Sequence, residues 1–90
     1  APSVSLVWTL QPASFGGGLR LWDVLYEGVP DSEIEPGDYA SVTLRSEAGD
    51  AVLFDSLRLH QIRPFRGDRD RISVTVHAVE VDRGAWEAWF

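Results

Sequence analysis

The stretch IEPGDYASVTLRSEAGDAVLFDSLRLHQI, residues 34–62, decides the fold class. It holds two apolar runs, residues 39–46 and 51–61, separated by the polar connection at residues 47–50. Apolar and polar side chains alternate in the first run, which is the period of a strand with one buried face. A four-residue polar connection that contains a glycine is typical of a β-hairpin turn. The stretch therefore predicts two antiparallel strands joined as a hairpin.

Two earlier segments show the same strand period. Residues 3–11 alternate, and the period predicts one core face, formed by Val4, Leu6, Trp8 and Leu10. Residues 19–27 are apolar on both faces. Such a pattern predicts a central strand, or a strand whose outer face meets another subunit.

Two later segments change phase part-way along. In residues 51–61 the alternation of apolar side chains shifts by one residue at positions 55–56, and in residues 71–82 it shifts at positions 77–78. A β-bulge at the first position, and a bulge or bend at the second, would return the apolar side chains to one face. Residues 85–90 are predicted either to pair as a final strand or to pack against the core. Five to six strands with short turns and no amphipathic helix thus predict a single all-β domain over residues 1–90, a small antiparallel sandwich or barrel.

Two family resemblances arise in this part of the chain. Residues 34–44 (IEPGDYASVTL) resemble the L-x-P-G-x-Y-x-V-x-V stretch that opens a late strand in bacterial immunoglobulin-like domains. This resemblance implies an immunoglobulin-like sandwich in which Tyr39 makes the corner contact. A weaker resemblance to Greek-key βγ-crystallin domains rests on residues 22–28, 36–39 and 55–58. Those domains bind calcium through paired acids, whereas apolar side chains fill the corresponding positions at 52–54 here.

Composition excludes several classes of protein. A formal net charge of −6 argues against nucleic acid as the main partner, because phosphate binding requires a basic surface. The chain has no cysteine, which excludes disulfides and thiolate metal sites. No apolar run approaches the length of a membrane span.

The charges are unevenly distributed. Between Asp23 and Asp50 lie eight acids and the single base Arg45. A later segment is basic, and its arginines are candidate partner-binding residues: Arg58, Arg63, Arg66, Arg69 and Arg71. Complementary acidic and basic segments favour salt-sensitive contacts between copies of the chain. Residues 66–68 spell Arg-Gly-Asp, in which the glycine is predicted to make the turn.

Catalytic and metal-binding signals are weak. His60 and His77 lie in predicted strands, and neither has an evident orienting partner, which a general base requires. The carboxylates of Asp31, Glu33, Glu35 and Asp38 crowd one connection, but their spacing matches no EF-hand. We therefore predict a solvated acidic loop, no enzymatic activity, no metal and no cofactor.

The glycine run at residues 16–18, within the predicted loop PASFGGG, lets a neighbouring backbone approach closely. A phosphate-binding loop would need a helix after the glycines and usually a lysine. Here a strand follows, and the chain contains no lysine. The run alone does not predict a phosphate site.

Aromatic side chains supply the remaining candidates. Trp86, Trp89 and Phe90 lie beside the end of the sequence and are predicted partner-binding residues. Trp22 and Tyr26 share one face of their strand and would form a platform for stacking a sugar. The main expectation is a non-catalytic module acting through protein–protein association, including self-association, either as an interaction domain or as a subunit of a larger, extracellular or viral-type assembly. The alternative is a carbohydrate-binding accessory module whose partner is a glycan.

Overall fold

The computed structural model describes residues 2–26, 28 and 33–90, and its regular structure is almost entirely β. No α-helix occurs in this part of the chain, and every strand pair is antiparallel. The predicted all-β class and sandwich-like arrangement are confirmed.

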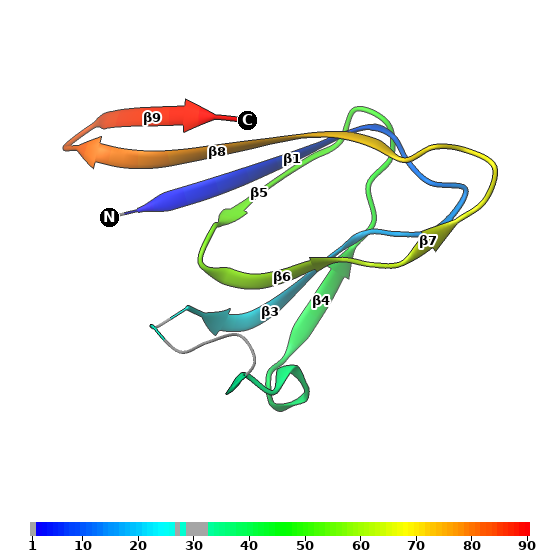
Figure 1. The fold of residues 1–90 in the computed structure, drawn as a ribbon, viewed down its shortest axis with the longest axis horizontal. Coiled ribbons are helices and arrows are strands. Elements are labelled where there is room, and N and C mark those ends of the chain that lie inside the picture. The colour runs from blue at the N-terminus through cyan, green and yellow to red at the C-terminus, as the bar shows by residue number, and fades with distance from the viewer. Residues whose placement is uncertain (1, 27, 29–32) are drawn as a thin grey trace.

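Two main sheets form the molecule (Figure 1). The four-stranded sheet has the order β5-β1-β8-β9, with β1 at Ser3–Gln11, β5 at Ala51–Asp55, β8 at Ile72–Asp82 and β9 at Ala85–Trp89. The three-stranded sheet has the order β4-β3-β6, with β3 at Leu19–Leu25, β4 at Ser41–Leu44 and β6 at Arg58–Ile62. A short ribbon pairs β2 (Phe15–Gly16) with β7 (Phe65–Arg66). Figure 1 shows the β8–β9 hairpin extending away from the three-stranded sheet.

The predicted hairpin at residues 39–61 is wrong, because its two arms belong to different sheets. Strand β4 pairs with β3, whereas β5 pairs with β1. The turn itself forms, with the Asp50 N–H donating to the Glu47 carbonyl over 3.0 Å. Its backbone also pairs with β1, since Thr9 donates to the Asp50 carbonyl and Gly49 donates to the Thr9 carbonyl. These bonds hold the start of β5 beside β1 and direct it away from β4.

Both predicted bulges are also wrong. At positions 55–56 the chain crosses from β5 to β6, and the Asp55 carboxylate accepts the Leu57 N–H over 2.9 Å. The crossing explains the phase change, because each half faces the interior from its own sheet. At positions 77–78 the pairing of β8 with β1 runs without interruption. The irregularity in β8 lies instead between Glu80 and Asp82. Residues 85–89 pair with β8 as the final strand.

The core face of β1 is the opposite of the predicted one. Ser5, Val7 and Thr9 are the buried side chains, whereas Trp8 and Leu10 are 45% and 42% exposed. Burial of Ser5 is tolerated because its hydroxyl bonds to Ser56 Oγ at 2.8 Å and to His77 Nδ1 at 2.9 Å. With its polar group satisfied, β1 presents its smaller side chains to the second sheet.

The core is small. Its buried members are Val7, Leu19 and Phe54, with Leu21 and Val52 packed against them. The molecule has 6454 Å² of accessible surface, whereas a compact domain of 10.0 kDa has about 5,200 Å². The radius of gyration is 14.5 Å, against about 12 Å for a compact chain of this length. Each chain therefore exposes about 1,200 Å² more than a compact domain does.

The strand order bears on the immunoglobulin-like resemblance. In that fold the strands are lettered A to G in chain order, and they form one sheet of strands ABED and a second sheet of strands CFG. Here β1 pairs with β5 and β8, and the next long strand, β3, lies in the other sheet. The first two long strands therefore do not share a sheet, as strands A and B do in the immunoglobulin fold. The predicted turn before β4 is present as the short 3-10 helix Pro36–Asp38, where Asp38 donates to the Glu35 carbonyl. Tyr39 ends this turn and is 41% exposed.

The glycine run brings β2 against β7, as the sequence predicts. Gly16 has a φ of +71°, and a Cβ built there would lie 2.6 Å from the Pro64 carbonyl oxygen. We expect Gly16→Ala to lower the free energy of unfolding by at least about 1–2 kcal/mol, because a left-handed conformation alone costs an L-residue that much. Urea denaturation followed by tryptophan fluorescence measures the change.

Gly37→Ala is the matched control. No atom lies within 4 Å of a Cβ at Gly37, and its φ is not positive. The control is expected to stay within about 0.5 kcal/mol of the wild type. Equal unfolding midpoints for the two variants would contradict the close approach at Gly16.

Candidate interaction surface

The most distinctive surface is the side of the four-stranded sheet that faces away from the core, here called the outer face. Strand register places Leu6 between Leu53 and Val76, and Trp8 between Ala51 and Val74. The face comprises the following apolar residues: Val4, Leu6, Trp8, Ala51, Leu53, Val74, Val76, Ala78, Trp86 and Ala88. The same register adds two carboxylates, Asp55 beside Val4 and Glu80 beside Trp86. The centre of the face is therefore wholly apolar.

The outer face is open to solvent. Leu53 is 65% exposed, Trp86 47% and Trp8 45%. Leu6 and Val76, at the centre, are half-buried by their neighbours within the sheet. The exposures show that no described element forms a second layer here. A contiguous apolar surface of this kind marks an interaction site in a soluble protein.

Strand β9 adds an open backbone edge to this sheet. The Glu80 N–H donates to the Pro2 carbonyl on the β1 side of β8. Because N–H groups alternate in direction along an antiparallel ladder, the backbone groups of Trp86 and Ala88 point away from β8. Strand β9 contains neither proline nor lysine, the residues that commonly protect an edge. This edge can accept another strand.

The five candidate arginines do not form one surface. Arg58 contacts the Asp23 carboxylate at 3.4 Å and donates to the Trp22 carbonyl at 3.2 Å. Arg66 lies over the Phe15 ring, with 5.7 Å to its centroid. Arg63 follows β6, whereas Arg69 and Arg71 lie in the segment between β7 and β8. Arg58 is therefore paired within its own chain, whereas the other four arginines lie within positions 63–71.

The candidate aromatic residues are also separated. Trp86 lies on the outer face, whereas Trp89 points to the opposite side, where its ring is 5.8 Å from that of His77. Phe90 is 96% exposed. Trp22 is only 7% exposed, and the Arg20 guanidinium lies 4.8 Å from its ring centroid. Tyr26 is half-exposed, so the predicted pair of stacking residues is not presented together.

The nearest approach to a catalytic pair is Ser5 with His77. Their Oγ and Nδ1 atoms are 2.9 Å apart, which is the spacing of a nucleophile and its base. Ser5 is 2% exposed, however, so a substrate cannot reach its hydroxyl. His60 bonds through Nδ1 to the Arg58 carbonyl at 2.6 Å, and its ring is tilted by 60° to that of Phe54. His77 thus bonds to a buried side chain, whereas His60 is exposed.

Metal and membrane signals were sought within residues 2–26, 28 and 33–90. They contain no group of three or more His, Asp or Glu side chains arranged to hold a metal ion. No helix among them has the length and apolarity to cross a membrane. Asp31 of the predicted acidic loop lies outside the described residues, while Glu33, Glu35 and Asp38 lie within them.

No protein-family model, curated protein or solved structure matches this chain.

Sequence reasoning missed Leu53, Val74 and Val76 as surface residues. It assigned the apolar stripe of β1 to the core, although the period of a strand does not indicate which face is buried. The available signal was in β8, which carries Val74 and Val76 on one face and Val79 on the other. Only one of those faces can meet the small second sheet.

Proposed function

We propose that this chain is a non-catalytic association module that binds a second copy of itself through the outer face. The exposed apolar centre of that face carries the proposal. Water contact with this surface is unfavourable by about 25 cal/mol for each Å². Covering it with an equivalent surface removes that cost on both copies at once.

Each chain exposes about 1,200 Å² beyond the surface of a compact domain over the whole molecule, and a standard interface buries about 800 Å² on each partner. Part of this excess lies on the outer face, where Leu53, Trp8 and Trp86 are exposed. Two twisted sheets pack face to face with a layer of interdigitated side chains between them. Since the same face is used by both copies, the contact is isologous and closes as a two-fold dimer.

The open edge of β9 supplies a second contact. Its outward backbone groups at Trp86 and Ala88 would pair with a strand of another molecule, extending dimers into a larger assembly. An assembly subunit of this kind agrees with the expectation from sequence. The contact proposed here is apolar, however, so it depends less on the charged segments than the sequence suggests.

The carbohydrate-binding alternative has less support. A sugar platform needs aromatic rings on one flat surface. Trp86 and Trp89 lie on opposite faces of β9, and Trp22 is buried. No single face therefore presents the aromatic residues that this function would use.

Light scattering over a range of concentration and salt tests the proposal. We expect a particle of at least twice the 10.0 kDa chain mass that dissociates on dilution. Because the contact is apolar, high concentrations of a kosmotropic salt should preserve or strengthen it. A monomer at every concentration, or an assembly that dissociates in salt, would contradict association through the outer face.

A further inference from the structure

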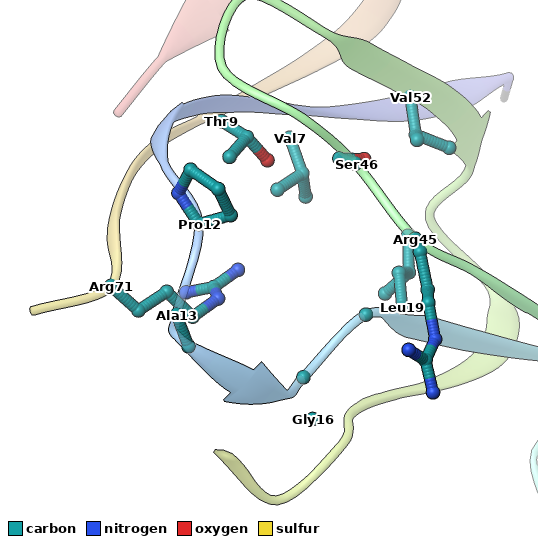
Figure 2. Close-up of a pocket in the computed structure, with 12 residues that line it drawn as sticks. Val7, Thr9, Pro12, Ala13, Gly16, Leu19, Arg45, Ser46, Val52 and Arg71 are labelled. Carbon is teal, nitrogen blue, oxygen red and sulfur yellow. The ribbon is translucent and has the colours of Figure 1, made fainter. Parts of the chain in front are cut away.

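A cavity of about 50 Å³ lies beside the glycine run, between the two main sheets (Figure 2). Its walls are formed by the end of β1, the glycines at positions 16–18 and the segment after β4. A single water needs only about 10–15 Å³ of such space. The cavity is therefore large enough for a polar group of a few heavy atoms.

Two arginines line this cavity. Arg71 reaches in from the segment ahead of β8, whereas the exposed Arg45, just after β4, borders the opposite side with its guanidinium directed past Leu19 (Figure 2). No carboxylate is among the lining residues, although the chain carries a net charge of −6. Thr9 and Ser46 add hydroxyl groups to the walls. The site is thus a local concentration of positive charge and hydrogen-bond donors in an acidic protein.

Arg71 is held in position by its neighbours. It is half-buried, its Nη1 atom donates to Ser73 Oγ at 3.1 Å, and its guanidinium lies 5.9 Å from the Phe65 ring centroid. These contacts satisfy part of the donor capacity of the guanidinium, and no carboxylate among residues 2–26, 28 and 33–90 forms an ion pair with it. Removing a charge from water is costly unless an opposite charge accompanies it. An anion in the cavity would supply that charge.

The glycines keep the space open. Gly16, Gly17 and Gly18 have φ angles of +71°, +80° and +89°. A Cβ at Gly18 would lie 2.9 Å from the Leu44 carbonyl oxygen, so no larger residue fits there without displacing the backbone. The glycine run has neither the lysine nor the helix of a phosphate loop. The fold instead brings cations to it from two distant segments.

We infer that this cavity binds a small oxyanion, a phosphate or carboxylate group, at the guanidinium of Arg71, with Arg45 at the rim as the second cation. Both guanidiniums are planar and always charged, which suits paired recognition of such oxygens. This site is separate from the outer face, and its occupation does not depend on self-association.

Nuclear magnetic resonance titration of the whole chain tests the inference. Inorganic phosphate and acetate are added in separate series at constant ionic strength, balanced with chloride. We expect saturable shifts of the backbone amide signals of Gly16, Gly17 and Gly18 with at least one of the two anions. A response to phosphate alone identifies a tetrahedral ligand group, and a response to acetate alone identifies a carboxylate.

Arg71→Gln is expected to weaken the fitted affinity at least about tenfold, because it removes a charge-assisted contact. Arg69→Gln, in the same turn but outside the cavity lining, should leave the affinity unchanged. If Arg71→Gln fails to fold, the anion affinity of Arg45→Gln is measured in its place, because Arg45 is exposed and its substitution should leave the fold intact. Absence of saturable shifts with both anions, or equal affinities in the cavity variants and Arg69→Gln, would overturn the inference.

Discussion

Leu53→Arg is expected to convert the associated protein into a monomer. Leu53 is 65% exposed in the single chain and lies beside Leu6 on the outer face. In a two-fold contact the substitution occurs twice, so two unpaired guanidiniums would be taken out of water. Burial of an unpaired charge costs several kcal/mol, and we expect the dissociation constant to rise at least about 100-fold. Sedimentation velocity over a concentration series measures this change.

The matched control is Thr43→Arg. Thr43 is exposed on β4, in the three-stranded sheet, and receives the same charge. Its association should match that of the wild type. Circular dichroism shows whether each variant retains its β structure. If Leu53→Arg associates as tightly as Thr43→Arg while folded, the outer face is not the contact.

Phe54→Ala is expected to cause the largest loss of stability. Phe54 is one of three buried hydrophobic residues in the core cluster, and its ring lies 4.9 Å from that of the exposed His60 on β6. Truncation of a buried phenylalanine typically costs about 3–5 kcal/mol. A domain of this size has a total stability of roughly 4–13 kcal/mol, so much of the margin would be lost. Urea denaturation below the association threshold measures the change.

Leu57→Ala serves as the comparison for Phe54→Ala. Leu57 lies only three residues along the chain and is 46% exposed. Because it is not part of the buried cluster, its truncation should cost less than about 1 kcal/mol. Similar losses at the two positions would show that the core does not lie between the sheets at Phe54.

The strand content was predictable because it depends on local sequence. Alternation in residues 3–11 and 39–46 is enough to indicate strands: the first segment is β1, and residues 41–44 of the second form β4. The pairing of those strands was not predictable in the same way. The turn at Glu47 and Asp50 forms as expected, but distant bonds from Thr9 decide which sheet receives β5.

The buried face of β1 illustrates the same limit. Ser5 is tolerated inside because it bonds to Ser56 and His77, which are 51 and 72 positions away. Nothing in the local pattern of β1 reveals those partners. The alternation of apolar residues alone favoured burial of the face of β1 that contains Trp8. The structure places that face outside.

The candidate sites show what long-range contacts add. The sequence marked the glycine run and Arg71 separately, and the fold brings them together with Arg45 around one cavity. It also pairs Arg58 with Asp23, a contact that joins the acidic and basic segments within one molecule. The types of residue in the sequence therefore indicated candidate binding residues. Their positions along the chain did not indicate which of them lie together in the fold.

Cross-linking between engineered cysteines tests the outer face most directly. The chain has no native cysteine, so Leu53→Cys and Thr43→Cys each introduce a single thiol. Each variant is treated with a flexible bifunctional maleimide at a concentration where the wild type associates, and covalent dimers are measured by denaturing electrophoresis. The proposed contact predicts abundant dimer from Leu53→Cys and only background from Thr43→Cys. Equal yields, or dimer from Thr43→Cys alone, would contradict association through the outer face.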